Sequence, residues 1–262
     1  MRVALMIEGQ EGVTWEQWVA LARAAEDAQL DALFRSDHYR SIARGDPNGS
    51  LDAWTILAGI AAVTTTIRLG TLVSPVTFRP ASVLAKVVTT VDHISNGRVE
   101  LGIGAGWYEA EHETYGFPFL TQRGRLDELD RQLAEIVRQW TEADDVWPKP
   151  LQRPRPPVIV GGRAKPRTVA AAVAYADEYN TVLPTPAEAK EWKSRVDEAA
   201  ANAGREPLRF SAMVKLEGSD AELEERLRAY EAAGVERVMM QHLSHEDLEP
   251  VGRLGEIAAR LR

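Results

Sequence analysis

Residues 67–107 read as two apolar strands joined by an amphipathic helix, and this β–α–β pattern limits the folds available to the chain. The first apolar run, 67–73, is expected to end at Ser74-Pro75, because proline lacks the N–H group that a central strand needs. A second apolar strand is expected at 99–102. Between them, apolar residues recur at helical spacing and are expected to share one buried face: Val83, Leu84, Val87, Val88, Val91 and Ile94. Such units have parallel strands with right-handed crossovers, so the sequence predicts a parallel α/β fold.

The alternation of strand and helix patterns extends along the whole sequence. Apolar strand segments are predicted at 3–7, 31–34, 67–73, 99–102, 158–160, 178–183, 208–216 and 237–242. A helical pattern follows each of them, whereas 108–124 is expected to be a loop. Eight strand–helix pairs indicate a parallel sheet that closes into a barrel, with an open doubly wound sheet as the alternative. No linker divides the chain, so we predict a single-domain (β/α)8 TIM barrel over residues 1–262.

The charge balance and the absence of cysteine narrow the possible functions. The chain has 31 Lys and Arg against 39 Asp and Glu, a formal net charge of −8, and no basic block, which argues against nucleic acid or an anionic membrane as a partner. Without cysteine, disulfides, thiolate nucleophiles and cysteine-ligated metals are excluded. The sequence shows neither a signal-peptide pattern nor a run of about 18 apolar residues. We therefore expect a cytoplasmic protein with a small-molecule substrate and no membrane partner.

Polar residues at the predicted strand ends are the candidates for chemistry, because barrel active sites gather at the carboxyl ends of the strands. Asp37-His38 follows the second strand. A histidine there is suited to proton transfer or to a hydrogen bond with a cofactor, because its pKa lies near neutrality. The alternative is a loop histidine that only pairs with its neighbour.

Two glycine-rich segments also follow predicted strands. The run 102–106 lacks the third glycine of a dinucleotide-binding loop, because Trp107 stands there. We interpret its glycines as allowing a planar ligand to approach the backbone beside Trp107, with tight turn geometry as the alternative. Gly161-Gly162-Arg163 lies between a strand and a helix start, where backbone amides and a guanidinium suit an anion.

Metal and Schiff-base chemistry are not expected. The acidic and histidine residues at 109–113, and the pair His242 and His245, form no complete coordination pattern, so we predict no metal site. No lysine stands out at a strand end, which removes the Schiff-base route and argues against a cofactor-free lyase.

Four segments near the strand ends have a distinctive sequence: SDHY at 36–39, GTLVSPVTFRPASVLAKVVTTVDHISNGRVELGIGAGW at 70–107, YGFPF at 115–119 with RGRLDEL at 123–129, and PPVIVGG at 156–162. Together they resemble the bacterial-luciferase-like superfamily of flavin and deazaflavin oxidoreductases. The resemblance is clear over 1–183 and is greatest to the branch that uses coenzyme F420, a 5-deazaflavin hydride carrier. It implies a TIM barrel and a homodimer.

The resemblance also implies roles for particular residues. Asp37 and His38 would lie beside the deazaflavin ring, with His38 the catalytic or ring-contacting residue. The Leu72–Val73 bond would be a cis peptide behind the ring. The remaining cofactor contacts would be Ala105 and Gly106 along the tail, and Gly161, Gly162 and Arg163 at the phosphate.

These residues lead us to expect an F420-dependent oxidoreductase that transfers hydride between the deazaflavin C5 and a small organic substrate. The substrate would lie between the ring and the side chains of Trp107 and Tyr108. Relatives that oxidise sugar phosphates carry a glutamate where Trp107 stands, so that reaction is not expected here. The alternatives are an FMN-dependent luciferase-like monooxygenase and a catalytically weak flavin- or deazaflavin-binding protein.

Overall fold

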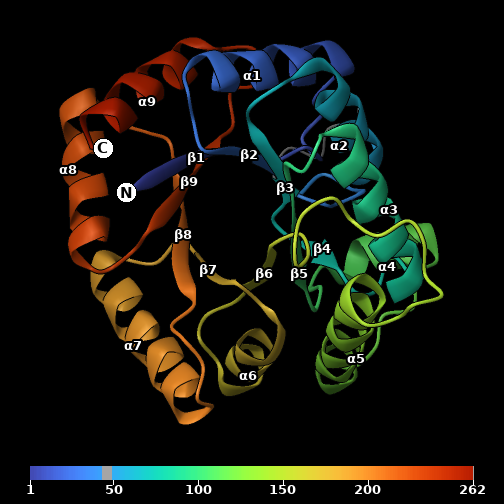
Figure 1. Ribbon diagram of the computed structural model, residues 1–262. Helices are drawn as coiled ribbons and strands as arrows, with labels where there is room; N and C mark the ends of the chain where they lie inside the picture. Colours follow the sequence, from blue (N-terminus) through green and yellow to red (C-terminus); the bar gives the residue numbers. More distant parts are fainter. Residues whose placement is uncertain (43–48, 262) are drawn as a thin grey trace.

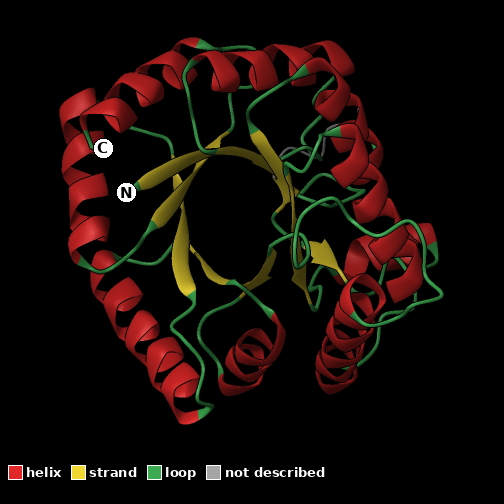
Figure 2. Ribbon diagram, in the orientation of Figure 1, coloured by secondary structure: helices red, strands yellow, loops and turns green. Residues whose placement is uncertain are grey.

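The computed structural model describes residues 1–42 and 49–261 and shows a ring of parallel strands surrounded by helices (Figures 1 and 2). The strand order is β3-β2-β1-β9-β8-β7-β6-β5-β4, and pairing of β3 with β5 closes the ring. Because β3 and β4 both pair with β5, they share one position in a closed barrel of eight strands. The predicted single-domain (β/α)8 TIM barrel is confirmed.

The elements have the following bounds in the described residues. The strand segments are β1 (Arg2–Ile7), β2 (Ala32–Arg35), β3 (Arg68–Thr71), β4 (Ser74–Pro75), β5 (Val99–Gly104), β6 (Val158–Gly161), β7 (Glu178–Val182), β8 (Arg209–Lys215) and β9 (Arg237–His242). The helices are α1 (Trp15–Asp27), α2 (Ala53–Val63), α3 (Ala81–Ile94), α4 (Glu109–Tyr115), α5 (Gln122–Thr141), α6 (Pro166–Tyr175), α7 (Pro186–Asn202), α8 (Asp220–Ala232) and α9 (Glu249–Arg260).

The predicted end of the third strand is wrong. Strand β3 stops at Thr71, the chain leaves the ladder at Leu72–Val73, and β4 then resumes pairing with β5. Pro75 is tolerated within β4 because the neighbouring ladder bond is made by the backbone N–H of Val76, which donates to Gly104 O at 2.9 Å.

The predicted loop at 108–124 is also wrong, since α4 forms within it and ends at Gly116 in the left-handed conformation. Its two buried residues are Glu111 and His112, both polar. A seven-residue helix that buries polar side chains lacks the apolar periodicity by which helices are predicted.

One face of α3 differs from the prediction. Leu84, Val88 and Val91 are buried, but Val83 and Ile94 are 48% and 44% exposed. The reason is helical geometry: Val83 and Ile94 are eleven residues apart, about three turns, and lie on an adjoining stripe that faces away from the barrel.

Two regions of core hold the barrel together. The larger lies between the strands and the surrounding helices. The smaller fills the barrel interior with Ala4, Met6, Ala32, Phe34, Leu72, Ile159, Met213 and Met239. These residues come from different strands around the ring, as side-chain layers in a TIM barrel do.

Below this apolar layer, at the amino ends of the strands, a buried ion network occupies the barrel. The Arg237 guanidinium lies 5.0 Å from the Phe34 ring and donates to Glu100 Oε2 at 2.7 Å and to Glu178 Oε2 at 2.6 Å. Burial raises the pKa of Glu178. Burial also opposes ionisation of Glu100, but the charge and hydrogen bonds of Arg237 lower its pKa to about 2. The network therefore joins β9 to β5 and β7 across the interior.

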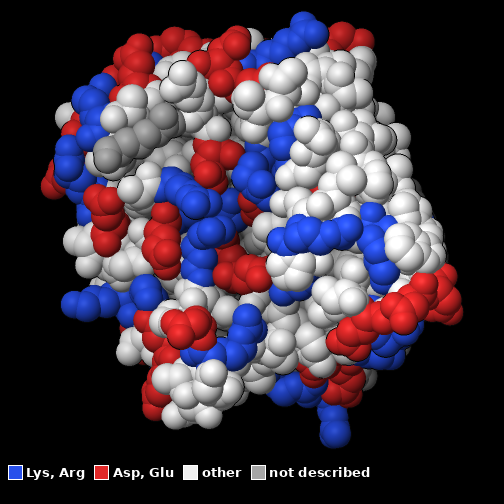
Figure 3. All heavy atoms as spheres, viewed as in Figure 1, with Lys and Arg blue, Asp and Glu red and all other residues white. Residues whose placement is uncertain are grey.

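The molecular surface shows both signs of charge. On the face seen in Figure 3, basic and acidic side chains are interspersed around the centre, whereas the surface over α2 and α3 is largely uncharged. Within the described ranges, the helices are too short or too polar to cross a lipid bilayer.

Candidate active site

The carboxyl ends of the strands, here called the barrel mouth, bring together most of the residues singled out in the sequence. The peptide bond between Leu72 and Val73 is cis. Leu72 belongs to the interior apolar layer, and Val73 packs against that layer from the same bulge. An apolar surface therefore lies at the top of the barrel interior, as the resemblance implies for the support of a ring.

The glycines of β5 do not have the role expected of them. A Cβ on Gly102 would lie 2.0 Å from Thr71 O, and one on Gly104 would lie 2.7 Å from a methyl group of Val73. The space beside these glycines is filled by the β3–β4 bulge and is closed to a ligand. The interpretation that they admit a planar ligand is therefore wrong, because their small size accommodates Val73 instead.

Asp37 is buried and held by a fixed set of donors. Its Oδ2 accepts from Ser74 Oγ at 2.6 Å and from Arg79 Nη1 at 2.7 Å. The same guanidinium pairs with Asp52 Oδ2 at 2.6 Å and donates to Tyr39 Oη at 3.1 Å. Although burial opposes it, the charges of Asp37 and its neighbours raise the pKa of Arg79. With its acceptor sites engaged below the mouth, Asp37 is placed to position the loop rather than to react.

His38 projects from the same loop and pairs with a residue far away in the sequence. Its Nδ1 lies 2.8 Å from Glu111 Oε1, and Glu111 Oε2 accepts the backbone N–H of Tyr39 at 3.1 Å. The His38 side chain is 13% exposed and that of Glu111 is 1% exposed. Because a carboxylate faces Nδ1, the proton of the neutral imidazole lies on Nδ1, and Nε2 is left as an acceptor.

Helix α4 carries Glu111 to His38 and is itself docked on the β2 loop. Arg40 Nη1 donates to Ala110 O at 3.3 Å and to Thr114 Oγ1 at 3.2 Å. Tyr115 Oη donates to Tyr39 O at 2.9 Å. These contacts attach α4 to the loop that follows β2.

His112 has a structural place beside Glu111. Its Nδ1 lies 2.7 Å from the carbonyl oxygen of Tyr108 and must therefore donate, so Nε2 accepts from Thr77 Oγ1 at 2.6 Å. The bond to Thr77 links α4 to the β4–α3 loop, and the bond to Tyr108 closes the first turn of α4. Glu111 and His112 thus turn to different partners, and the described residues contain no group of three or more acidic, histidine or cysteine side chains able to hold a metal ion.

Trp107 and Tyr108 form the aromatic side of the site. Their rings are stacked with centroids 5.3 Å apart, and the His38 ring meets the Trp107 ring edge-on at 5.8 Å. Trp107 is 62% exposed, which is unusual for so large an apolar ring. The structure places both residues beside His38, where the sequence predicts a substrate site.

The segment between Trp107 and β5 is held by one arginine. Gly106 adopts a left-handed φ of 77° and accepts the Nε–H of Arg125 at 3.1 Å. The Arg125 guanidinium also lies 4.1 Å from the centroid of the Phe119 ring. Ala105 and Gly106 are half-buried at the mouth and directly follow β5, the strand next to β6.

Gly161, Gly162 and Arg163 lie in the turn between β6 and α6, as predicted. A Cβ on Gly162 would meet Tyr179 Oη at 2.6 Å, and this hydroxyl accepts the backbone N–H of Ala164 at 2.9 Å. Arg163 is exposed, and the first turn of α6 has no side-chain cap. The backbone N–H groups of Gly162 and Ala164 are thus engaged within the protein, and the turn offers the exposed guanidinium of Arg163 and the uncapped first turn of α6 at the edge of the mouth.

Glu8 is a mouth residue for which the sequence predicts no role. It follows β1, and its two oxygens accept from Gln241 Nε2 at 2.6 Å and Gln10 Nε2 at 2.9 Å. Gln10 in turn accepts from Ser36 Oγ, beside Asp37. Its position directly after the apolar strand 3–7 marks it as a strand-end residue but assigns it no role.

The expectation that no lysine lies at a strand end is wrong. Lys215 is the last residue of β8 and is paired in register with Gln241. It was missed because its strand was predicted to extend one residue further. The predicted absence of a lysine at a strand end therefore no longer argues against Schiff-base chemistry.

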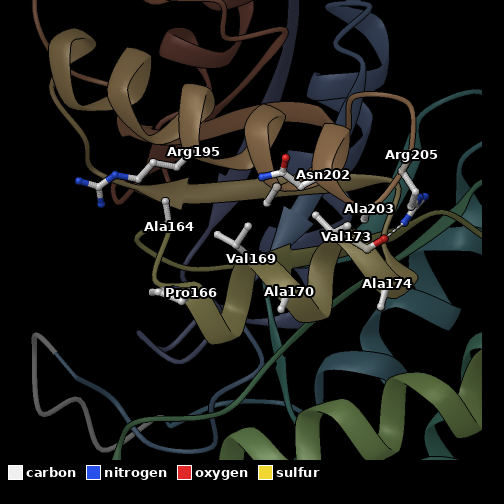
Figure 4. A pocket seen from close by; sticks show the side chains of 11 residues that line it. Ala164, Pro166, Val169, Ala170, Val173, Ala174, Arg195, Asn202, Ala203 and Arg205 are labelled. Carbon is white, nitrogen blue, oxygen red and sulfur yellow. Dashed lines mark hydrogen bonds between the residues drawn. The ribbon is translucent and has the colours of Figure 1, made fainter.

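A groove of about 870 Å³ lies on the outer wall of the barrel, between α6 and α7 (Figure 4). Its sides are mostly alanine and valine, with Val169 and Val173 facing α7. Arg205 donates to the Val173 carbonyl oxygen at one end, and the Arg195 side chain extends away from the groove. Apart from Ala164, this groove contains none of the mouth residues.

Known proteins share this fold and parts of the sequence. An uncharacterized protein of Mycobacterium tuberculosis is 36% identical over 154 residues, which span 53% of this chain and 50% of that protein. The chain thus matches about half the length of the curated relative. An F420-dependent secondary alcohol dehydrogenase, solved with an F420–acetone adduct, superposes with a TM-score of 0.85 at 15% identity over 100% of this chain and 99% of the other.

A second solved structure is the oxygenating constituent of 3,6-diketocamphane monooxygenase of Pseudomonas putida in complex with FMN. It superposes with a TM-score of 0.80 at 16% identity over 99% of this chain and 98% of the other. At such identities the two superpositions show a common fold. The sequence match to the family described as luciferase-like monooxygenase extends over residues 1–261. The chain therefore belongs to the luciferase-like monooxygenase family.

Proposed function

We propose that the protein is an F420-dependent oxidoreductase that transfers hydride between the deazaflavin C5 and a small organic substrate. The observation that carries the proposal is the pair His38 and Glu111, with Nδ1 to Oε1 at 2.8 Å, next to the exposed ring of Trp107. Reducing a carbonyl or imine requires a proton as well as a hydride, and an oriented imidazole can supply it. Family members include oxidoreductases and monooxygenases.

The chemical character of the residues at the mouth is suited to a deazaflavin. Leu72 and Val73 offer an apolar support at the top of the barrel interior. Arg163 and the uncapped first turn of α6 suit the phosphate of the side chain. Ala105 and Gly106 directly follow β5, the strand between these two regions, where the tail would pass. When bound, F420 supplies the hydride chemistry at its C5.

The residues of the chain would bind the cofactor, orient the substrate and supply a proton to it. Glu111 holds the imidazole of His38 in one orientation, with Nδ1 directed at its carboxylate. Protonated at Nε2, His38 would donate that proton to an oxygen or nitrogen atom of the substrate. Trp107 and Tyr108 would cover the substrate and reduce its contact with water. Asp37, fixed by Arg79, keeps the preceding residue of the loop in place.

An FMN-dependent monooxygenase is the second candidate. The turn Gly161–Arg163 favours it as much as the first, because FMN also carries a ribityl phosphate. Titration of the purified chain with reduced F420 and with FMN, followed by fluorescence, separates the two. We expect micromolar binding of F420; micromolar binding of FMN alone would overturn the first proposal.

The catalytic role of His38 is tested by His38→Ala, with His93→Ala as the matched control. His93 lies on the exposed side of α3, where its Nε2 contacts Lys149 O. We expect His38→Ala to bind cofactor normally and lose turnover by about 100-fold or more, and His93→Ala to keep both. Equal turnover in the two variants contradicts the assignment. Cofactor binding without turnover on carbonyl and imine substrates would instead support a cofactor-binding protein.

We also propose that the protein is a homodimer that buries the outer face of α2 and α3. This face is largely uncharged in Figure 3 and exposes Val63, Val83 and Ile94. Exposed apolar side chains on a face with few charges are typical of protein interfaces. Light scattering coupled to size exclusion should give twice the mass of the chain, and Ile94→Glu should reduce it to one. A monomeric wild-type protein at micromolar concentration would refute the proposal.

A further inference from the structure

Three polar side chains on β8, β9 and β1 are directed into the barrel mouth by the alternation of side chains along a strand. On β8, Met213 belongs to the interior apolar layer, whereas the residues on either side of it belong to the outer core. Successive side chains of a strand point to opposite faces, so Lys215, two residues further on, points to the same side as Met213. The same rule directs two more side chains into the mouth, from β9 and β1: Gln241 and Glu8.

Lys215 rises from the accessible part of the mouth floor. In the interior layer, Leu72 is 9% and Met213 is 7% exposed, and the other members are at most 1% exposed. In the strand order of the closed ring, β8 lies opposite the position that β3 and β4 share. Lys215 therefore faces the apolar support of Leu72 and Val73 from across the mouth.

The Lys215 ammonium is not used by the fold. It makes neither an ion pair nor a hydrogen bond within the ranges 1–42 and 49–261. Gln241, its partner in register on β9, donates from Nε2 to Glu8 Oε1 at 2.6 Å, and Glu8 Oε2 accepts from Gln10 Nε2 at 2.9 Å. The neighbouring polar groups are thus held by one another, and the cation on β8 is left for a ligand.

Apolar side chains lie on the other side of Lys215. Val182, at the end of β7, is paired in register with Met213 and is 39% exposed. Leu183 follows it, 48% exposed, with a left-handed φ of 49° that is uncommon for a residue other than glycine. Its backbone N–H donates to Met213 O at 2.9 Å and holds the chain in this conformation. A ligand of Lys215 would therefore have apolar surface beside it on β7.

We propose that Lys215 determines substrate specificity by binding a carboxylate, so that the substrate is a small apolar carboxylic acid that also carries the carbonyl or imine group to be reduced. One ammonium compensates one negative charge. The Glu8 carboxylate, held by Gln241 on the adjacent strand, disfavours a second one, which argues for a carboxylate over a phosphate. This assignment rests on the proposed use of the mouth as a substrate site.

Benzoate and benzamide make the direct test, because they have the same ring and similar size and only benzoate is charged. In calorimetric titrations of the full chain at neutral pH, benzoate should bind about tenfold more tightly than benzamide, as expected for one hydrogen bond to a charged group. Phenyl phosphate should bind more weakly than benzoate. Equal affinities for benzoate and benzamide, no benzoate binding at millimolar concentration, or tighter binding of phenyl phosphate would each overturn the proposal.

Three variants locate the binding. Lys215→Met should remove the preference for benzoate, whereas Lys215→Arg, which keeps the charge, should retain it. Lys190→Met, at an exposed position on α7, is the matched control and should behave as wild type. A benzoate preference that survives in Lys215→Met would place the anion elsewhere and refute the assignment.

The cofactor titration separates this proposal from the proposed function. Lys215→Met should bind F420 or FMN as tightly as wild type does, and weaker cofactor binding in this variant would assign Lys215 to the cofactor and overturn its role in specificity. The benzoate titration requires neither cofactor nor turnover. A benzoate preference lost in Lys215→Met would therefore support the carboxylate site even if F420 did not bind.

Discussion

Glu111 Oε1 lies 2.8 Å from Nδ1 of His38, a residue 73 positions earlier in the chain, and helix α4 carries Glu111 to this contact. Glu111→Gln keeps the size of the side chain and removes its charge. We expect turnover to fall by about 10- to 100-fold with cofactor affinity and substrate KM little changed, because an amide can donate as well as accept and no longer fixes the tautomer and orientation of the His38 ring. Steady-state kinetics and a cofactor titration measure the two effects.

The control for this variant is Glu113→Gln, an exposed position on the same helix. It should leave turnover unchanged. If both variants lose turnover equally, the effect comes from the helix and not from the pair.

Removal of Arg79 should destabilise the fold strongly. Arg79→Met leaves buried Asp37 without its ion partner, and breaking such a pair typically costs about 3–5 kcal/mol. Arg123, 88% exposed and 3.9 Å from Asp127, provides the comparison, and Arg123→Met should change the free energy of unfolding by less than about 0.5 kcal/mol. Urea denaturation measures both. A loss below about 1 kcal/mol for Arg79→Met would show that Asp37 does not depend on this pair.

A Gly→Ala substitution should have a very different effect on stability at the bulge than on an outer helix. Gly102→Ala would place a methyl group 2.0 Å from Thr71 O, a backbone atom, and we expect a loss of about 1–3 kcal/mol or more. Gly252, in α9, has open space around its Cβ position, and Gly252→Ala should stabilise the chain by roughly 1 kcal/mol. Thermal or urea unfolding gives both values. Similar effects in the two variants would contradict the close approach at Gly102.

Glu26 should contribute a pH-dependent part of the stability. Burial opposes its ionisation, but the backbone N–H groups of Thr66, Thr65 and Ile67 outweigh this and lower its pKa from 4.5 to about 2. A carboxyl whose pKa is lowered by folding stabilises the fold at every pH above its pKa in the unfolded chain. This contribution is lost as the pH falls from about 4.5 to 2. Wild type should therefore exceed Glu26→Gln in stability at pH 6, and the difference should shrink toward pH 2. A difference that does not change with pH would exclude this carboxylate as the cause.

Much of the architecture could be predicted because strand and helix patterns alternate at regular spacing. The barrel, the position of Asp37-His38 after β2 and the turn Gly161–Arg163 all follow from which residues end a strand. Those predictions depend on local sequence, and parallel strands bring their carboxyl ends to one side of the sheet.

The missed features depend on contacts between distant segments. Glu111 reaches His38 only because α4, which has no apolar stripe, docks through Arg40 and Tyr115. The glycines of β5 looked available to a ligand because the sequence does not reveal that Val73 fills the adjacent space. A single sequence carries no signal for either contact.

The buried ion network at the base of the barrel has a consequence for how the ring closes. Arg237 on β9 meets Glu100 on β5 and Glu178 on β7, so three strands must each hold one alignment for the charges to match. A slip of β9 by one residue would turn the guanidinium out of the barrel, and Glu100 and Glu178 would keep only the partly exposed guanidiniums of Arg68 and Arg209 as ion partners. Apolar side chains in the same places would tolerate such a slip far better. The network thus favours one alignment of the strands. It lies at the end of the barrel opposite the mouth, where it can be rigid without restricting access to the mouth.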